Sequence, residues 1–136
     1  MSRKTDITKI HVVALVLENQ QGEILVAKRA KDKHQGGLWE FPGGKVERGE
    51  TRIQALKREI KEELNYKLQQ AKPLKCITHQ YDKLMVKLDV WYSKDINPQV
   101  YANEKQPLKW VSKTDLLTLA MPEADKPIIK AINQKI

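Results

Sequence analysis

The sequence contains little cysteine, few aromatic residues and no long apolar run. Cys76 is the one cysteine among 136 residues, so the chain cannot form an internal disulfide, and we expect it in the reducing cytoplasm. No apolar stretch approaches the ~20 residues that a membrane-spanning helix needs. The charged residues 1–6 also lack the apolar stretch of a signal peptide. These absences predict a cytoplasmic protein with no membrane partner.

Basic residues outnumber acidic ones by 25 to 17, which gives the chain a net charge of +8. Such a surplus favours an anionic ligand such as a nucleotide. The lysines are scattered, however, and no continuous basic run marks an RNA-binding arm. Aromatic residues make up only 6% of the sequence, which is few for a surface that stacks the bases of a nucleic-acid strand. We therefore expect no obligatory nucleic-acid partner.

The chain has no internal repeat, no low-complexity segment and no Pro/Gly/Ser-rich linker. Its length suits one hydrophobic core, so residues 1–136 are predicted to form a single domain. Strands are expected at residues 10–17, 23–29, 39–41, 74–80, 84–93 and 108–111, where apolar and β-branched residues concentrate or alternate. A turn at residues 19–22 would join the first two in a hairpin, and Pro42-Gly43-Gly44 should break regular structure. Monomer and homodimer are both compatible with the sequence.

The clearest helical pattern covers residues 51–64. Thr51 and Gln54 form a capping-box pair, apolar residues recur at positions 53, 56, 60 and 64, and Asn65 can end the helix in the left-handed conformation. A brief helix is expected at residues 115–120 and a terminal helix at residues 127–136, where Pro127 fits the first turn. The mixed order of strands and helices predicts an α/β (α+β) sandwich.

Three carboxylates stand close together on this helix. Glu59, Glu62 and Glu63 occupy positions i, i+3 and i+4, and at about 100° per residue they share one face, away from the apolar stripe. Crowded carboxylates repel one another, and a hard divalent cation such as Mg²⁺, which prefers oxygen ligands, removes that repulsion. The same pattern also fits a solvated acidic face paired with Lys57 and Arg58. The helix by itself leaves both interpretations open.

The residues around these glutamates form a longer pattern. Gly44 is followed six positions later by Glu50, and the helix then carries Arg58-Glu59-Ile60-Lys61-Glu62-Glu63. This resembles the signature of the Nudix hydrolase family, which reads glycine, five residues, glutamate, seven residues, Arg-Glu-aliphatic-any-Glu-Glu, any residue, glycine and an aliphatic residue. Asn65 stands in place of the second glycine and Tyr66 in place of the last aliphatic residue. The run before the signature, residues 39–47, is similar to the MutT-like branch of the family.

The resemblance implies a Nudix-type α/β/α sandwich with a mixed β-sheet between helices, and a site for Mg²⁺, with Mn²⁺ as a possible substitute. Glu104, on a late loop, would be either a further metal ligand or a plain surface residue. The remaining roles follow by position in the signature. The predicted catalytic residues are Arg58, Glu59, Glu62 and Glu63; the metal ligands are the three glutamates and the carbonyl of Gly43; Gly44 and Glu50 are structural.

The resemblance also implies that the nucleotide is contacted from outside the helix. MutT-like relatives carry asparagine where this chain has Asp125. An ionised aspartate only accepts hydrogen bonds, so it favours bases that present donors, unless burial keeps it protonated. Asp125 could instead cap the last helix. The predicted substrate-binding residues are Arg29, His34, Glu40, Phe41, Pro42, Gly43, Lys45 and Asp125, with Lys45 facing the phosphates.

The implied activity is hydrolysis of a nucleoside triphosphate, such as the oxidised nucleotide 8-oxo-dGTP, to the monophosphate and pyrophosphate. This would remove damaged nucleotides before DNA replication. The alternatives are hydrolysis of CTP or modified dCTP, pyrophosphohydrolysis at RNA 5′ ends, and a non-catalytic nucleotide-binding Nudix module. The complete set of glutamates disfavours the last of these, and the scattered lysines disfavour RNA.

Overall fold

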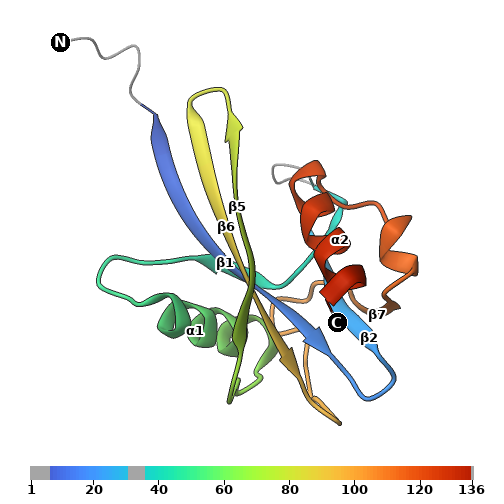
Figure 1. Cartoon of the computed structure of the whole chain (residues 1–136). Helices are drawn as coiled ribbons and strands as arrows, with labels where there is room; N and C mark the ends of the chain where they lie inside the picture. Colours follow the sequence, from blue (N-terminus) through green and yellow to red (C-terminus); the bar gives the residue numbers. More distant parts are fainter. Residues whose placement is uncertain (1–6, 31–35, 136) are drawn as a thin grey trace, which may run out of the picture.

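A mixed β-sheet with a helix against each face forms the framework of the chain in the computed structural model, which describes residues 7–30 and 36–135 (Figure 1). The sheet runs in the order β3-β2-β1-β6-β5, with β4 paired to β1 and β7 paired to β2. Only β1 and β6 are parallel. The predicted α/β sandwich is thus confirmed. The strands are β1 (Thr8–Glu18), β2 (Glu23–Lys28), β3 (Trp39–Glu40), β4 (Gly43–Lys45), β5 (Lys72–Tyr81), β6 (Leu84–Lys94) and β7 (Leu108–Ser112).

The central strand β1 contributes to two separate cores, because alternate residues of a strand point to opposite faces of the sheet. Leu15 faces α1 (Arg52–Leu64) and packs in one core with Leu56. Val16 faces α2 (Lys126–Lys135) and packs in the other with Ile128. All four side chains are fully buried. Burial on both faces explains why β1 is a nearly continuous apolar run rather than an alternating one.

Helix α1 begins and ends where the sequence predicts. The Thr51 side chain accepts a hydrogen bond from the backbone N–H of Gln54, and the Gln54 side chain accepts one from the backbone N–H of Thr51. Asn65 ends the helix with a φ of 51°, in the left-handed region. The buried stripe, which includes Leu56, Ile60 and Leu64, turns the opposite face of α1 away from the sheet.

The expected break at Pro42-Gly43-Gly44 is wrong for the two glycines. Gly43–Lys45 forms β4, antiparallel to β1, with Ala14 opposite Gly43 and Val13 opposite Gly44. The chain thus changes its partner strand at this point: β3 pairs with β2, and β4, which follows it, pairs with β1. Proline has no backbone N–H to donate, so the break falls at Pro42. Glycine has no Cβ, and this allows the next residues to lie close against β1.

The expected α-helix at residues 115–120 is also wrong, because Asp115–Leu117 forms a single 3₁₀ turn. The Asp115 N–H at its start donates to the Ser112 hydroxyl at 3.1 Å. Pro122 disfavours a helical conformation in the residue before it, and this limits the length of the segment. A second 3₁₀ turn, Glu123–Asp125, leads directly into α2, which confirms the predicted terminal helix up to Lys135.

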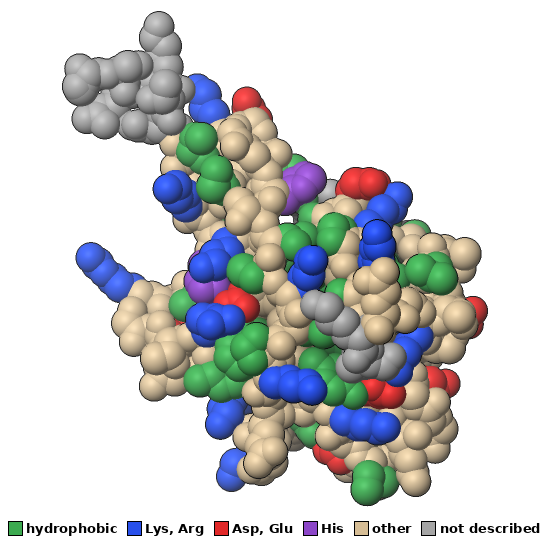
Figure 2. All heavy atoms as spheres, in the orientation of Figure 1, with side chains coloured by type: hydrophobic (Ala, Val, Ile, Leu, Met, Phe, Trp, Pro, Cys, Tyr) green, Lys and Arg blue, Asp and Glu red, His purple; other side chains and the backbone are tan. Residues whose placement is uncertain are grey.

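Lysine and arginine side chains are spread over the face shown in Figure 2, among apolar and other polar groups, and they do not gather in one patch. Cys76 lies exposed on β5 as a free thiol. Among the described residues, no helix is long and apolar enough to cross a membrane.

Candidate metal and nucleotide site

The glycines of β4 lie directly against two glutamates of α1. The Gly43 N–H donates to Glu63 Oε2 at 2.9 Å. A Cβ added at Gly44 would stand 2.5 Å from Glu59 Oε2, with the other carboxylate atoms nearer still. A Cβ at Gly43 would overlap the backbone of β1 at Val13. Both glycines are therefore required for the close approach of strand, helix and carboxylates.

Arg58 connects the glutamates to the loop before the helix. Its guanidinium donates twice to Glu50, from Nε at 2.7 Å and Nη2 at 3.0 Å, and once to Glu59 Oε2 at 2.9 Å. It also reaches Glu62 Oε1 at 3.4 Å and the Lys45 carbonyl at 3.0 Å. The two-point pairing with Glu50 fixes the plane of the guanidinium. Arg58 thus holds Glu59 in a defined orientation beside Gly44.

Two of the three glutamates are disfavoured as anions in the metal-free protein. Burial raises the pKa of Glu63 to about 8, and the charges of Glu104 and Glu59 add to the effect against the opposing hydrogen bond from Gly43. Burial also raises the pKa of Glu59, although Arg58 works to lower it. Glu62, by contrast, is exposed. A fully solvated acidic face does not explain Glu59 and Glu63, because both are partly buried against β4.

The loop that carries Glu104 is tied to the end of α1. Asn103 donates through its backbone N–H to the Glu63 carbonyl at 3.0 Å and through its side chain to the Glu62 carbonyl at 3.2 Å. The Gln106 side chain donates to the Glu63 carbonyl at 3.3 Å. These bonds satisfy carbonyls that a helix end leaves unpaired. They bring Glu104 close enough to raise the pKa values of Glu59 and Glu63. Sequence reasoning missed Asn103 and Gln106, for which the spacing carries no signal.

The donor groups at this site fit a hard divalent cation, since carboxylate and backbone carbonyl oxygens are the ligands that such ions prefer. Within the described part of the chain, no three acidic, histidine or cysteine side chains converge as a closed set around one point. Glu59 is turned to Arg58 and Glu63 to Gly43. Burial first, and then the neighbouring carboxylates, raise the pKa values of Glu59 and Glu63, and a bound cation would favour the ionised form of both.

Three of the predicted substrate-binding residues, Arg29, Glu40 and Asp125, lie near enough to one another to interact electrostatically. Arg29 pairs with Glu40 at 3.3 Å, and the charge of Glu40 contributes to the raised pKa of Asp125. Asp125, in turn, contributes to the raised pKa of Tyr81, after burial of that hydroxyl. Tyr81 ends β5, with its ring 4.3 Å from that of His79. These two aromatic residues were missed by sequence reasoning. His34 lies outside the described residues.

Asp125 is buried, with 7% of its surface exposed. Burial raises its pKa to about 7, and the charge of Glu40 adds to the effect. Within the described residues its carboxylate makes no hydrogen bond with the backbone of α2, which leaves the alternative role as a helix cap without support. A carboxyl group that is half protonated near neutral pH can donate as well as accept a hydrogen bond.

Three other predicted substrate-binding positions differ in exposure. Phe41 is 6% exposed and packs in the core on the α2 face. Pro42 is buried, and its carbonyl accepts a hydrogen bond from the Leu15 N–H at 2.8 Å. Both residues therefore fix the path of the chain into β4, and their contact with substrate stays a prediction. Lys45 is exposed on β4, beside the glutamates, because its carbonyl binds Arg58.

We expect Asp125→Asn to flatten the pH dependence of stability. The folded pKa of about 7 lies above the unfolded value near 3.9, so the stabilising contribution of protonated Asp125 is complete below pH ~4 and is lost as the pH rises through ~7. Asparagine cannot ionise, and the variant should gain up to ~4 kcal/mol over the wild type at pH 8.5. Urea unfolding of both proteins at pH 5 and 8.5, without metal, measures this. A parallel loss of stability in the two proteins would contradict it.

Comparison with known proteins gives a consistent result. A family model described as NUDIX domain matches residues 13–131. The chain is 36% identical over 122 residues to the CTP pyrophosphohydrolase of Escherichia coli (strain K12), covering 90% of each. It is 29% identical over 126 residues to the 8-oxo-dGTP diphosphatase of the same organism, covering 93% of this chain and 98% of that protein. A solved MutT structure, from work on Aliivibrio salmonicida and Vibrio cholerae, matches with a TM-score of 0.80 at 35% identity, covering 95% of this chain and 100% of that chain.

Proposed function

The chain belongs to the Nudix family of hydrolases, and on that premise we propose that it is a nucleoside triphosphate pyrophosphohydrolase that uses Mg²⁺. Nudix hydrolases generally depend on a divalent metal. The main support for this proposal is that Glu59 and Glu63 lie directly against the Gly43-Gly44 backbone, with Arg58 bound to Glu59. Mn²⁺ would serve as a substitute, because it accepts the same oxygen donors.

Each residue of the site has a separate task in this proposal. Glu59, Glu63 and the Gly43 carbonyl would supply oxygen ligands, and Glu104, whose charge acts on both glutamates, is a candidate for a further one. When bound, Mg²⁺ screens the phosphate charge and lowers the pKa of a coordinated water. Glu62 is the most exposed of the three glutamates, at 55% of its side chain, and we assign it the removal of the proton from the attacking water. Lys45 would contact the substrate phosphates.

We take the substrate to be an oxidised deoxynucleoside triphosphate such as 8-oxo-dGTP, converted to the monophosphate and pyrophosphate. The 8-oxo-dGTP diphosphatases among its relatives support this assignment. Damaged nucleotides would thereby be removed before DNA replication, in the cytoplasm, by one Nudix domain comprising residues 1–136. A single copy of the chain supplies every residue named for this activity, so either a monomer or a homodimer could perform it.

A second candidate is a cytosine nucleotide, either CTP or modified dCTP. The chain shares 36% identity with a CTP pyrophosphohydrolase, and the base-contacting position holds Asp125 in place of asparagine. A protonated Asp125 can donate to the ring N3 of cytosine and accept from its amino group. An ionised Asp125 only accepts, which suits the neighbouring N–H donors of a guanine edge. The protonation of this one buried group would therefore decide between the two bases.

A screen of pyrophosphate release with Mg²⁺ tests the proposal, over normal and oxidised dNTPs, CTP derivatives, ADP-ribose and triphosphorylated RNA. We expect turnover of nucleoside triphosphates, with 8-oxo-dGTP preferred to dGTP, and a large loss of rate in Glu62→Gln. Turnover of RNA alone would favour the RNA alternative. No turnover of any compound, with Glu62→Gln identical to the wild type, would identify a binding module instead.

Asp125→Asn should change which base is preferred. The asparagine amide donates and accepts at every pH, so the ratio of 8-oxo-dGTP to CTP turnover should become independent of pH in the variant. In the wild type this ratio should rise as the pH increases through ~7, where Asp125 ionises. Measurements of kcat/KM for both substrates from pH 6 to 8.5 check this. Parallel profiles for the two proteins would show that Asp125 does not contact the base.

A further inference from the structure

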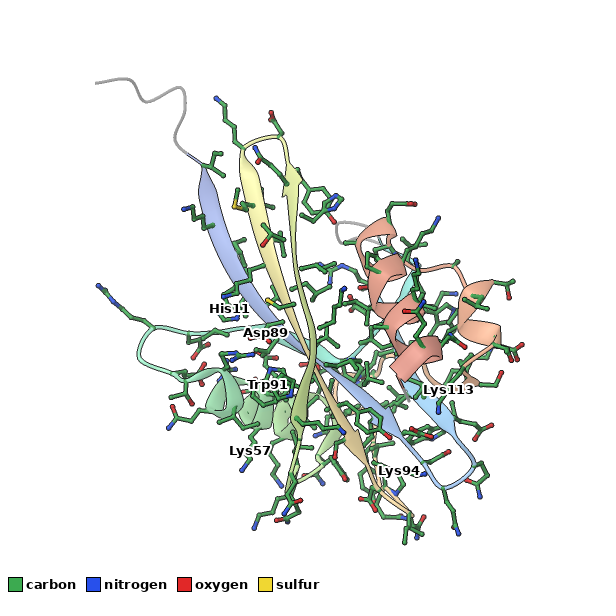
Figure 3. The ribbon with its side chains drawn as sticks, viewed as in Figure 1. His11, Lys57, Asp89, Trp91, Lys94 and Lys113 are labelled. Carbon is green, nitrogen blue, oxygen red and sulfur yellow. The ribbon has the colours of Figure 1, made fainter. Side chains whose placement is uncertain are left out.

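A second buried carboxylate lies beneath the first turn of α1, on the face of the sheet that this helix covers. Asp89 on β6 is 1% exposed and accepts two hydrogen bonds from Arg52, from Nε at 2.5 Å and from Nη2 at 2.9 Å. It also pairs with His11 Nε2 on β1 at 2.9 Å. Figure 3 shows His11, Asp89 and Trp91 together at the end of α1 where the helix begins. We call Arg52, Asp89 and His11 the clamp.

The buried, charged carboxylate of Asp89 holds the Arg52 side chain against β6. A carboxylate buried as deeply as Asp89 is strongly destabilising when it lacks a partner. Burial works to raise the pKa of Asp89, but the hydrogen bonds from Arg52 and His11 outweigh it and hold that pKa below its ordinary value. The guanidinium of Arg52 also lies 4.8 Å from the centre of the Trp91 ring, within the range of a cation–π contact. Arg52, the first residue of α1, thus contacts two side chains of β6, Asp89 and Trp91.

The clamp connects α1 to the same strand that supports the glycines. His11 uses its ring for Asp89 and its carbonyl to accept a hydrogen bond from the Val46 N–H at 2.9 Å, directly after β4. Two residues further along β1, Val13 stands opposite Gly44. Arg52 precedes Glu59 by seven residues, about 10 Å along a helix axis. A shift of the first turn of α1 along its axis would therefore move Glu59 and Glu63 relative to Gly43 and Gly44.

We propose that Arg52 is a positioning residue, which through Asp89 and His11 fixes α1 at the depth where Glu59 and Glu63 meet the Gly43-Gly44 backbone. Its own side chain contacts neither these glutamates nor β4 among the described residues. Arg58 fixes the helix near its middle, and the clamp fixes it at its first turn. The inference rests on the proposed function only in so far as the glutamates bind a metal.

Arg52→Gln tests the proposal, with Lys57→Gln as the matched control. Both residues are exposed cations of α1 and lose one charge, but Lys57 makes no contact with the clamp. In Arg52→Gln we expect Mn²⁺ affinity to fall about tenfold and kcat to fall about tenfold with little change in KM, the scale typical of partners that orient metal ligands. Arg52→Lys, which retains one donor and the charge, should recover part of the loss. Lys57→Gln should stay within twofold of the wild type in all measurements.

A readout without metal separates positioning from simple stabilisation. The Gly43 amide proton, which is bonded to Glu63, should exchange with solvent about tenfold faster in Arg52→Gln than in Lys57→Gln, well below the unfolding temperature of either. A lower unfolding temperature with unchanged Gly43 exchange and unchanged Mn²⁺ affinity would overturn the proposal, leaving Arg52 a stabilising residue only. Should Arg52→Gln not fold, His11→Gln carries the same test. A wild type that binds Mn²⁺ but hydrolyses no nucleotide would reject the proposed function and not the clamp.

Discussion

Replacing Glu63 with glutamine is expected to lower kcat/KM by about 10³-fold, the scale of losing a group that acts on the transition state, and at the same time to make the metal-free protein more stable. The two effects have one cause. Glu63 is a partly buried carboxylate whose pKa is raised to about 8, so its ionised form costs folding free energy. Glutamine keeps the shape and the acceptor for the Gly43 N–H but cannot bind a metal as an anion.

The sign of the stability change depends on pH and on metal. The stabilising contribution of protonated Glu63 is complete below its unfolded pKa of ~4.3 and is lost as the pH rises through about 8. The gain in Glu63→Gln should therefore be largest near pH 9, at about 1–2 kcal/mol. Adding Mg²⁺ reverses the order, because only the wild type gains stability from binding the ion.

Thermal unfolding at pH 6 and 9, with and without Mg²⁺, together with pyrophosphate release, measures these effects. Glu47→Gln is the matched control. The Glu47 side chain is 67% exposed, and its ion pair with Arg58 is long, at 3.8 Å. We expect it to change activity less than threefold and to leave the Mg²⁺ response unchanged. Equal activity in Glu63→Gln and Glu47→Gln would remove Glu63 from the metal site.

Alanine at Gly44 and alanine at Gly43 are expected to fail in different ways. At Gly44 the new Cβ meets the Glu59 carboxylate, the end of a flexible side chain. Glu59 can turn aside, so the fold should survive while the ligand is displaced, and a displacement of about 1 Å can cost about 10²-fold in rate. At Gly43 the new Cβ meets backbone, 2.7 Å from the Ala14 Cα. Backbone paired in a sheet cannot turn aside, and we expect a loss of about 3 kcal/mol or more.

The contrast is measured by urea unfolding and by steady-state kinetics on both variants. Gly44→Ala should unfold within about 1 kcal/mol of the wild type, as a surface change would, yet lose most of its activity. A second substitution, Glu59→Gln, should add little to the loss in Gly44→Ala, because the ligand is already displaced. Additive losses would show that Gly44 acts independently of Glu59. Gly49→Ala, at a loop glycine with a φ of +86° and open space around it, controls for backbone strain alone.

The sequence by itself determined the helix that carries the glutamates. The capping box at Thr51, the apolar stripe through Leu56 and Ile60, and the left-handed Asn65 are all local features, set by contacts within a few residues, and each is found where it was predicted. The spacing of Gly44, Glu50 and Arg58 also led to the family, because the chemistry of the site requires these residue types at fixed distances along the chain.

The tertiary structure alone decided which of the three glutamates are shielded from solvent. Glu59, Glu62 and Glu63 look equivalent on a helical wheel, but β4 covers two of them and leaves the third in solvent. The strand β4 was itself mistaken for a break, because its pairing with β1 joins residues about thirty positions apart. The burial of Asp125 likewise depends on contacts with distant segments, so the sequence could not distinguish a base-contacting residue from a helix cap at this position.

Arg52 shows this limit most plainly, since its sequence neighbours predict nothing but a solvated first turn. Its partner Asp89 lies 37 residues away, on a strand brought beside α1 only by the parallel pairing of β1 and β6. Local sequence specifies what each segment can form, because capping, alternation and helical spacing act over a few residues. Burial of charge, and with it the distribution of pKa values and the fixed position of the glutamates, depends on contacts between distant segments and is set only when the sheet assembles.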